Sequence, residues 1–398
     1  MANVNSIIDP GLEELLTKDP SWIYEYEKTA FDKLAAPFEK SFVLFGAGNL
    51  GRKVLDVLRK ENIEPLAFSD NNQALWGKDI EGLHVYSPIE AAKLFGQKAA
   101  FVVTIWNTEH SFIETKHKLL NLNCLKVISA ISFRWKHPKS LLPFFWLDLP
   151  SKTYKEAELI KTAYKLWSDD FSRTEFIAQL KFRLLGEFDS ISSPVPQESY
   201  FPDDIFELKS DENFVDCGAF DGITIRNFLK HKPDFQGRII AYEPDPGNYH
   251  DLSVFVSDLD RVLAERILVI PYAVGAKESM VHFDASGTMG STVSTNGGIE
   301  VKCVSLNESL KAQQFLPSYI KMDIEGSELD ALKGITELMT KPPILAICLY
   351  HRYDDLWRIP LFIESLSDQY RFFLRPHEIE GWQLVCYAVP ISRLINPE

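Results

Sequence analysis

Apolar runs of about four to eight residues alternate with helical segments in two separate stretches of the chain, and this alternation restricts the possible fold most. Such a pattern is typical of buried parallel strands joined by crossover helices. The first stretch contains the runs SFVLFGAG, PLAFSD and AAFVVTIW. The second contains FVDCGAF, RIIAYEPD, ILVIPYAV, YIKMDIEG and ILAICLYH. We therefore expect an α/β protein with two mostly parallel sheets.

The order of these patterns divides the chain into four predicted parts. Residues 1–40 have apolar positions at helical spacing, and residues 41–131 form a small α/β domain. Residues 132–211 form a helical connector that ends in a segment rich in Ser and Pro. Residues 212–398 form the second α/β domain, which closes with RFFLRPHE and QLVCYAVP. We expect these last two segments to pair as a hairpin.

The charge of the chain bears on its partners. A formal net charge of −14 results from 56 acidic and 42 basic residues, and no basic run of useful length occurs. Nucleic-acid binding depends on dense Lys and Arg surfaces, so we do not expect a nucleic-acid partner. A homo-oligomer is compatible with this composition.

The cysteines and the N-terminus bear on the compartment. The five cysteines are scattered and form no Cys-x-x-Cys pair, so neither a disulfide framework nor a zinc knuckle is indicated. Free thiols fit a reducing environment. No signal-peptide pattern begins the chain, and no apolar run approaches the length of a membrane span. We therefore expect a cytoplasmic protein without a membrane span.

A glycine-rich loop follows the first predicted strand. Gly46, Gly48 and Gly51 form a G-x-G-x-x-G pattern, and Asp70 ends the next strand 24 positions after Gly46. In dinucleotide-binding folds this spacing places the glycines near a pyrophosphate and the acid near a ribose. The short domain is expected to bind a mononucleotide or nucleotide-sugar as readily as NAD. Alternatively, it is a Rossmann-like scaffold that has kept the turn without a ligand.

The segment NFVDCGAFDGITIRNFL is the strongest signal for a ligand site. A buried strand ends at Asp216, and Gly218 and Gly222 remove Cβ atoms where a ligand approaches the backbone closely. Doubly wound sheets bind nucleotide-like ligands in the crevice beyond such a strand end. Asp216 and Asp221 suit a ligand with a sulfonium cation and an amino-acid moiety better than a pyrophosphate. Taken alone, the segment is also consistent with a tight strand–helix turn.

A second acid lies at the end of the next predicted strand. Glu243 follows Asp216 by 27 positions, where a carboxylate can accept hydrogen bonds from both ribose hydroxyls. Pro244 stops this strand and turns the chain over the adenosine. The third strand is expected to end with Ala273 and Val274, whose small side chains leave room for an adenine ring. The order and spacing therefore predict an adenosine site.

The segment SYIKMDIEGSELDALKG places Asp323 at the end of the fourth strand. This carboxylate is expected to orient or deprotonate an acceptor hydroxyl, or to hold a divalent cation that does so. Alternatively, Asp323 and Glu325 only cap the following helix.

Together, VDCGAFDG, AYEPDP, IKMDIEGSELDALKG and LYHRYDDLWRIP resemble the FkbM family of S-adenosylmethionine-dependent methyltransferases, over residues 200–390. The resemblance implies a class I methyltransferase fold with a Rossmann-like, mostly parallel seven-stranded sheet. It also implies methyl transfer to a hydroxyl, with sugars or polyketide-type natural products as acceptors. By motif it places Glu243 at the ribose and Asp323 at the catalytic strand end. It places in the donor loop Asp216, Gly218, Ala219 and Gly222.

After the fifth strand, His351 is expected to lie close to Asp323 across the sheet. An imidazole with an ordinary pKa of about 6.5 can accept the hydroxyl proton as a general base. A divalent metal such as Mg²⁺ is an open alternative, with Asp323, Asp354 and Asp355 as candidate ligands. Asp354 and Asp355 equally favour the start of a helix, where the helix dipole stabilises negative charge.

Two further segments flank the expected site. Residues 279–306 predict a β-hairpin, in which Gly287 to Gly298 either close over the substrate or form an exposed loop. Tyr200 and Phe201 either stack on a sugar face or form a hydrophobic contact between domains.

The sequence therefore predicts an S-adenosylmethionine-dependent methyltransferase that acts on a hydroxyl of a small-molecule or saccharide acceptor. The alternative is an oxidoreductase, epimerase or scaffold protein that binds NAD or a nucleotide-sugar through the N-terminal loop. An oxidoreductase would need a catalytic Tyr and Lys, or a His, beyond that loop, and the sequence offers no convincing set.

Overall fold

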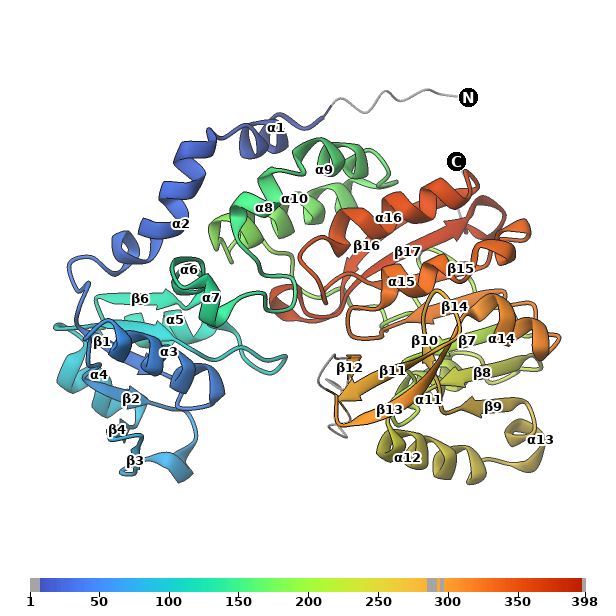
Figure 1. Cartoon of the computed structure of the whole chain (residues 1–398), viewed down its shortest axis with the longest axis horizontal. Coiled ribbons are helices and arrows are strands. Elements are labelled where there is room, and N and C mark those ends of the chain that lie inside the picture. The colour runs from blue at the N-terminus through green and yellow to red at the C-terminus, as the bar shows by residue number, and fades with distance from the viewer. Residues whose placement is uncertain (1–7, 285–291, 294–296, 396–398) are drawn as a thin grey trace. The chain divides into compact units, whose positions relative to one another are not determined.

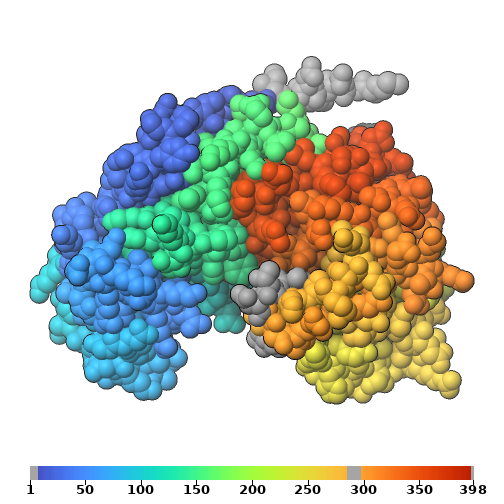
Figure 2. All heavy atoms as spheres, viewed as in Figure 1, coloured from blue at the N-terminus to red at the C-terminus, as the bar shows by residue number. Residues whose placement is uncertain are grey.

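The computed structural model describes residues 8–284, 292, 293 and 297–395 (Figure 1). The chain divides into two compact units. The N-terminal unit comprises Met1–Ala157 and Ile177–Ser192, and the C-terminal unit comprises Glu158–Phe176 and Ser193–Glu398. Blue to blue-green residues belong mainly to the first unit and yellow to red residues to the second (Figure 2). The four-part division of the sequence stays a prediction.

The N-terminal unit is built on a six-stranded sheet with the order β3-β4-β2-β1-β5-β6. All neighbouring strands pair in parallel except β3, which is antiparallel to β4 at the edge. The strands are β1 (Phe42–Phe45), β2 (Ala67–Ser69), β3 (Asp79–Ile80), β4 (Leu83–Tyr86), β5 (Ala100–Val103) and β6 (Lys126–Ser129). The helices are α1 (Pro10–Leu16), α2 (Pro20–Ala35), α3 (Asn49–Lys60), α4 (Pro88–Phe95), α5 (Phe112–Asn121), α6 (Ile131–Lys136), α7 (Pro138–Leu141) and α8 (Pro150–Tyr154). This arrangement confirms the predicted Rossmann-like fold.

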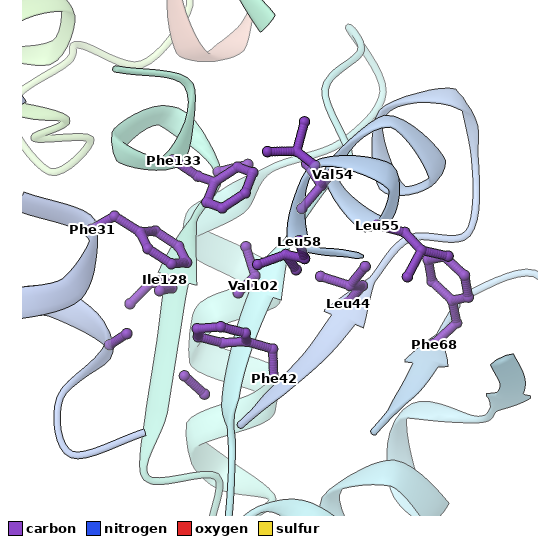
Figure 3. Close-up of a cluster of buried hydrophobic side chains, with 14 of the residues drawn as sticks. Phe31, Phe42, Leu44, Val54, Leu55, Leu58, Phe68, Val102, Ile128 and Phe133 are labelled. Carbon is purple, nitrogen blue, oxygen red and sulfur yellow. The ribbon is translucent and has the colours of Figure 1, made fainter. Parts of the chain in front are cut away.

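The core of this unit lies between the sheet and its helices (Figure 3). Every residue of β1 is buried, as expected for a central parallel strand covered on both faces. Helix α3 turns an apolar stripe to the sheet and its charged residues to solvent. The labelled side chains of the core, which point toward one another from strands and helices, are Phe31, Phe42, Leu44, Val54, Leu55, Leu58, Phe68, Val102, Ile128 and Phe133.

The C-terminal unit contains a seven-stranded sheet with the order β16-β17-β15-β14-β7-β8-β9. Its strands are β7 (Asn213–Cys217), β8 (Arg238–Tyr242), β9 (Ile267–Ile270), β14 (Tyr319–Met322), β15 (Ile344–Cys348), β16 (Tyr370–Pro376) and β17 (Leu384–Pro390). Strand β17 pairs antiparallel with both β15 and β16, and the other pairs are parallel. The predicted terminal hairpin and the mostly parallel seven-stranded sheet are thus confirmed.

A second, four-stranded sheet with the order β10-β13-β11-β12 is inserted after β9. Its strands are β10 (Ala273–Val274), β11 (Ser279–Asp284), β12 (Thr292–Val293) and β13 (Ile299–Val304). The antiparallel register of β11 and β13 confirms the predicted hairpin. One expectation was wrong: ILVIPYAV is two strands, since β9 ends at Ile270, before Pro271, and β10 pairs with β13 in the other sheet.

Helices cover the remaining segments of the C-terminal unit. Asp245 caps α12 by accepting hydrogen bonds from Gly247 and Asn248, and Pro246 occupies the first helical turn, where proline is favoured. The helices are α11 (Ile223–His231), α12 (Pro246–Ser257), α13 (Arg261–Ala264), α14 (Leu306–Ala312), α15 (Glu328–Lys333) and α16 (Asp355–Leu366). Helices α9 (Ala157–Tyr164) and α10 (Asp170–Leu185) contain residues of both units. Within the described ranges, no helix is both long and apolar enough to cross a membrane.

The glycine loop of the N-terminal unit offers a matched test of packing. A Cβ atom on Gly51 would lie 1.9 Å from the carbonyl oxygen of Gly46, whereas one on Gly48 would have no atom within 4 Å. We expect Gly51→Ala to lower the free energy of unfolding by about 3 kcal/mol or more, because the backbone must shift. Gly48→Ala should cost at most about 1 kcal/mol. Urea unfolding of the two variants measures the difference, and equal losses would contradict it.

Candidate active site at the carboxyl ends of four parallel strands

The strand order of the large sheet reverses at β7, which lies between β8 and β14. In open α/β sheets, ligands bind outside the carboxyl ends of the strands at such a reversal. The structure places four sequence-predicted residues at the ends of adjacent strands, namely Glu243 after β8, Asp216 in β7, Asp323 after β14 and His351 just beyond β15. The candidate site is therefore the edge that these strand ends form.

The loop after β7 has a left-handed backbone at three positions. Gly218, Phe220 and Gly222 have φ values of 79°, 50° and 89°. A Cβ atom on Gly218 would lie 1.9 Å from the carbonyl oxygen of Asp323, and one on Gly222 would lie 2.7 Å from Phe255. Both glycines are thus required by packing of the chain against itself, which the expectation of close ligand approach did not include. Ala219 is fully buried in the same loop.

Glu243 connects the loops that follow β7 and β8. One of its carboxylate oxygens accepts a hydrogen bond from the amide of Phe220 at 2.8 Å, and the other from Asp245 at 2.9 Å. Burial raises the pKa of Glu243 despite these two hydrogen bonds. A carboxylate has about four lone-pair positions, so Glu243 keeps acceptor capacity for two hydroxyl groups. Pro244, which follows it, is half-buried.

Asp216 is buried in an ion pair and not at the surface of the loop. Its Oδ1 lies 3.0 Å from the Nζ of Lys321, which stands beside it in the sheet register on β14. The Lys321 ammonium also donates a hydrogen bond to the carbonyl of Gly218 at 2.6 Å. Burial raises the pKa of Asp216 even though Lys321 opposes this shift. The ion pair therefore joins β14 to β7 and its loop.

Asp323 lies at the centre of the site and accepts hydrogen bonds on both oxygens. The hydroxyl of Tyr200 donates to Oδ2 and that of Tyr350 donates to Oδ1, both at 2.9 Å. Burial would raise the pKa of Asp323, but the hydrogen bond from His351 and the charge of Lys321 outweigh it and lower this pKa. Asp323 is therefore an anion at neutral pH.

His351 lies among three carboxylates. Its Nε2 is 3.3 Å from Oδ1 of Asp323 and 3.7 Å from Oε1 of Glu325, and its Nδ1 is 2.8 Å from Oε1 of Glu328. Burial lowers the pKa of His351, but the charge of Glu328 and the hydrogen bonds from the ring outweigh it and raise this pKa well above its ordinary value. Burial raises the pKa of Glu325 to about 7. The predicted proximity of His351 to Asp323 is confirmed.

The structure brings together a different set of possible metal ligands from the set that the sequence suggested. Asp323, Glu325 and His351 place one ligand atom each within 4.8 Å of one another. Asp354 instead pairs with Arg358, and Asp355 accepts a hydrogen bond from the amide of Arg352 at the start of α16. Sequence reasoning considered Glu325 only as a helix cap and missed Glu328.

The remaining predicted residues have local partners. Asp221 pairs with Arg226 at 3.1 Å, and its Oδ1 accepts a hydrogen bond from the amide of Ile223. Ala273 and Val274 are buried in β10 of the smaller sheet and not at the end of β9, which corrects their predicted place. Residues 287–298, predicted either to close over the substrate or to form an exposed loop, lie mostly outside the described residues.

Tyr200 is held by a hydrogen-bond network within the C-terminal unit. Its φ of 71° is unusual for a residue other than glycine, and such strain persists where surrounding contacts fix it. Its amide donates to the hydroxyl of Tyr387, which lies 2.7 Å from Nε2 of His377, and its carbonyl accepts from the hydroxyl of Tyr319. Phe201 packs against aromatic residues of the same unit.

The glycine loop of the N-terminal unit lies at the carboxyl end of β1. Asp70 is tied to this loop, since its Oδ2 accepts a hydrogen bond from the amide of Ala47 at 2.8 Å. The hydroxyl of Thr104, after β5, donates to the carbonyl of Gly46 at 2.8 Å. Gly48 is exposed at the start of α3 and has no side-chain cap. Nucleotide binding by this loop stays a prediction.

In the large sheet, β17 is the one antiparallel strand, with β15 on one side of it and β16 on the other. This strand order, together with the acidic residues at the edge, defines a Rossmann-like methyltransferase fold. Residues 216–379 match the methyltransferase FkbM domain. The C-terminal unit thus contains the region that matches this domain, and the family resemblance drawn from the sequence is confirmed.

Two known proteins are similar to this chain. A crystal structure of a methyltransferase FkbM from Methylobacillus flagellatus superposes with a TM-score of 0.73 at 21% identity, covering 95% of this chain and 97% of that one. This likeness shows the fold. A hexuronic acid methyltransferase, AglP of Haloferax volcanii, is 27% identical over 110 residues. That alignment covers 26% of this chain and 44% of the relative, so it spans less than half of the relative's length.

The buried ion pair predicts a specific loss of stability. We expect Lys321→Met to lower the free energy of unfolding by about 3–5 kcal/mol, because Asp216 is left buried without an opposite charge. The double variant Asp216→Asn/Lys321→Met removes both charges and should recover part of that loss. Urea unfolding of the three proteins measures this, and a double variant as unstable as the single one would contradict the role of the pair.

His377 predicts a pH dependence of stability. Burial lowers its pKa to about 4 in the folded chain, against about 6.5 for an unperturbed histidine. The neutral folded form therefore contributes stability above about pH 6.5, and this is lost as the pH falls toward 4, by at most about 3 kcal/mol. We expect His377→Gln to reduce the difference in unfolding free energy between pH 7 and pH 5. An unchanged difference would show that His377 does not cause it.

Proposed function

We propose that the C-terminal unit transfers the methyl group of S-adenosylmethionine to a hydroxyl of a sugar, glycan or natural-product acceptor. The observation that carries this proposal is the position of Asp323. This anion lies at the end of the strand next to the β7 loop, hydrogen-bonded by Tyr200 and Tyr350. Its side chain is 21% exposed, so an acceptor can reach it.

The residues at the edge fit such a donor. Glu243 lies at the end of β8, with acceptor capacity left for the two ribose hydroxyls. The partly exposed Asp221 and the anionic Asp323 give the edge a negative charge, which suits a donor with a sulfonium and an ammonium group. The donor would supply an electrophilic methyl group. We propose that Glu243 holds the ribose and that the loop residues 218–222 lie against the amino-acid moiety.

The chain's own residues then align the acceptor and manage its proton. The acceptor oxygen forms a bond to the methyl carbon as the carbon–sulfur bond breaks, and its proton leaves to Asp323 and then to solvent. Alignment contributes most in such a displacement, and the two tyrosines fix the Asp323 carboxylate for it. Since His351 has a raised pKa and both ring nitrogens face carboxylates, we assign it the role of holding Asp323 in place of the general base expected from the sequence.

The proposed acceptor class rests on a relative. The similar protein from Haloferax volcanii is named for methylation of a hexuronic acid, which supports a sugar as the acceptor of this chain. Oxygen as the methylated atom fits the site, because the partly exposed Asp323 anion can accept a hydrogen bond from an acceptor hydroxyl.

The donor assignment has a direct binding test. We expect Glu243→Ala to abolish binding of S-adenosylhomocysteine in calorimetry, because the ribose loses its acceptor. Asp251→Asn, which changes an exposed acid on α12, is the matched control and should bind normally. Undiminished affinity of Glu243→Ala would refute the assignment.

The catalytic assignment separates binding from turnover. We expect Asp323→Asn to retain S-adenosylhomocysteine affinity and to lower the methylation rate by about 100-fold or more, the usual contribution of a positioned acid or base. The measurement is methyl transfer to a panel of sugars, with Asp251→Asn as control. A variant that still methylates at the rate of the unaltered protein would remove Asp323 from the mechanism.

A further inference from the structure

The cluster of Asp323, Glu325 and His351 has the spacing of a metal-ligand set. The Nε2 of His351 lies 3.3 Å from an oxygen of Asp323 and 3.7 Å from an oxygen of Glu325. Divalent ions bind such atoms at about 2.0–2.2 Å, so neighbouring ligand atoms of one ion are about 3.0–3.6 Å apart. The three atoms thus need to move little to share an ion.

The imidazole of His351 is oriented for this role by a contact on its other ring nitrogen. Its other nitrogen, Nδ1, lies 2.8 Å from Oε1 of Glu328, a fully buried carboxylate. Glu328 is itself fixed, because the same oxygen accepts a hydrogen bond from the amide of Ile324 at 2.8 Å. A carboxylate on the far nitrogen is the usual support of a metal-binding histidine, since it sets the tautomer and the ring direction. Nε2, the other nitrogen, is left facing the two outer carboxylates.

The outer side of the cluster is open, whereas the inner side is closed. The side chain of His351 is 2% exposed, but those of Asp323 and Glu325 are 21% and 20% exposed. Glu325 also has a φ of 52°, and strained backbone of this kind is concentrated at ligand clamps and active sites. An ion held here would keep coordination positions toward solvent, as catalytic metal sites do.

We propose that Asp323, Glu325 and His351 bind a divalent cation of the Mn²⁺ type, with Glu328 as the positioning residue. Two carboxylates and an imidazole suit such a borderline ion better than Ca²⁺, which prefers oxygen alone. This inference rests on the proposed function for its purpose: the cation binds the acceptor oxygen and lowers the pKa of its hydroxyl. The proton then passes to Oδ2 of Asp323, the oxygen outside the cluster.

The test measures binding of Mn²⁺ alone to the full chain after removal of metals with a chelator. Calorimetry of the unaltered protein should show one Mn²⁺ per chain. We expect Glu325→Gln and His351→Gln to weaken this binding at least about 10-fold, and Glu328→Gln about 10- to 100-fold. Asp354→Asn is the matched control, since Asp354 pairs with Arg358, and it should bind Mn²⁺ normally.

Several outcomes would overturn the proposal. These are absence of Mn²⁺ binding up to millimolar concentration, unchanged binding by Glu325→Gln, or an equal loss in Asp354→Asn. Circular dichroism confirms that each variant is folded, and the conservative Glu328→Asp should recover part of the affinity if Glu328 positions the ring. S-adenosylhomocysteine binding is measured in parallel. A chain that binds this molecule but not Mn²⁺ loses only the metal proposal, and one that binds Mn²⁺ alone loses only the donor assignment.

Discussion

The ammonium group of Lys321 is the interaction on which the candidate site depends. It lies between the two central strands at the reversal of the sheet, 3.0 Å from Asp216 and 2.6 Å from the carbonyl of Gly218. Its position fixes the β7 loop against the end of β14. The two segments are so close there that a Cβ atom on Gly218 would meet the backbone of Asp323. A positive charge at this point also stabilises Asp323 as an anion. One buried pair thus sets the shape and the charge of the edge.

Much of the fold could be predicted from the sequence, because the hydrophobic period and the residues at the strand ends are local features of the chain. The runs around β1, β7, β8, β14 and β15 all became strands near the predicted places. The break in ILVIPYAV was missed because two apolar runs adjoin across Pro271, and only pairing with β13 shows that Ala273 belongs to another sheet. A proline inside a predicted strand was the available signal, since it argues against a continuous central strand.

The site was less predictable, because partners across the sheet are not local in sequence. The pattern placed Asp216 at a strand end, but which residue faces it depends on the register with β14, where Lys321 is opposite. Tyr200 lies more than a hundred positions before Asp323 and reaches it only through the fold. Glu328 lies in the first turn of α15, and nothing in the sequence showed that it meets His351. The sequence spacing therefore located the edge of the sheet, but only the structure shows which residues pair there.

The charge balance around His351 links the two proposals. Three carboxylates lie within 4 Å of the ring, and Lys321 is already engaged with Asp216, so the cluster favours one further positive charge. Without a metal ion, a proton on the imidazole supplies that charge, which is why the pKa of His351 is raised. A divalent cation would take the place of this proton at Nε2, while the proton on Nδ1 stays shared with Glu328. A carboxylate as weakly basic as Asp323 is a poor acceptor for the proton of a free alcohol, and a cation beside it removes that difficulty by making the alcohol more acidic.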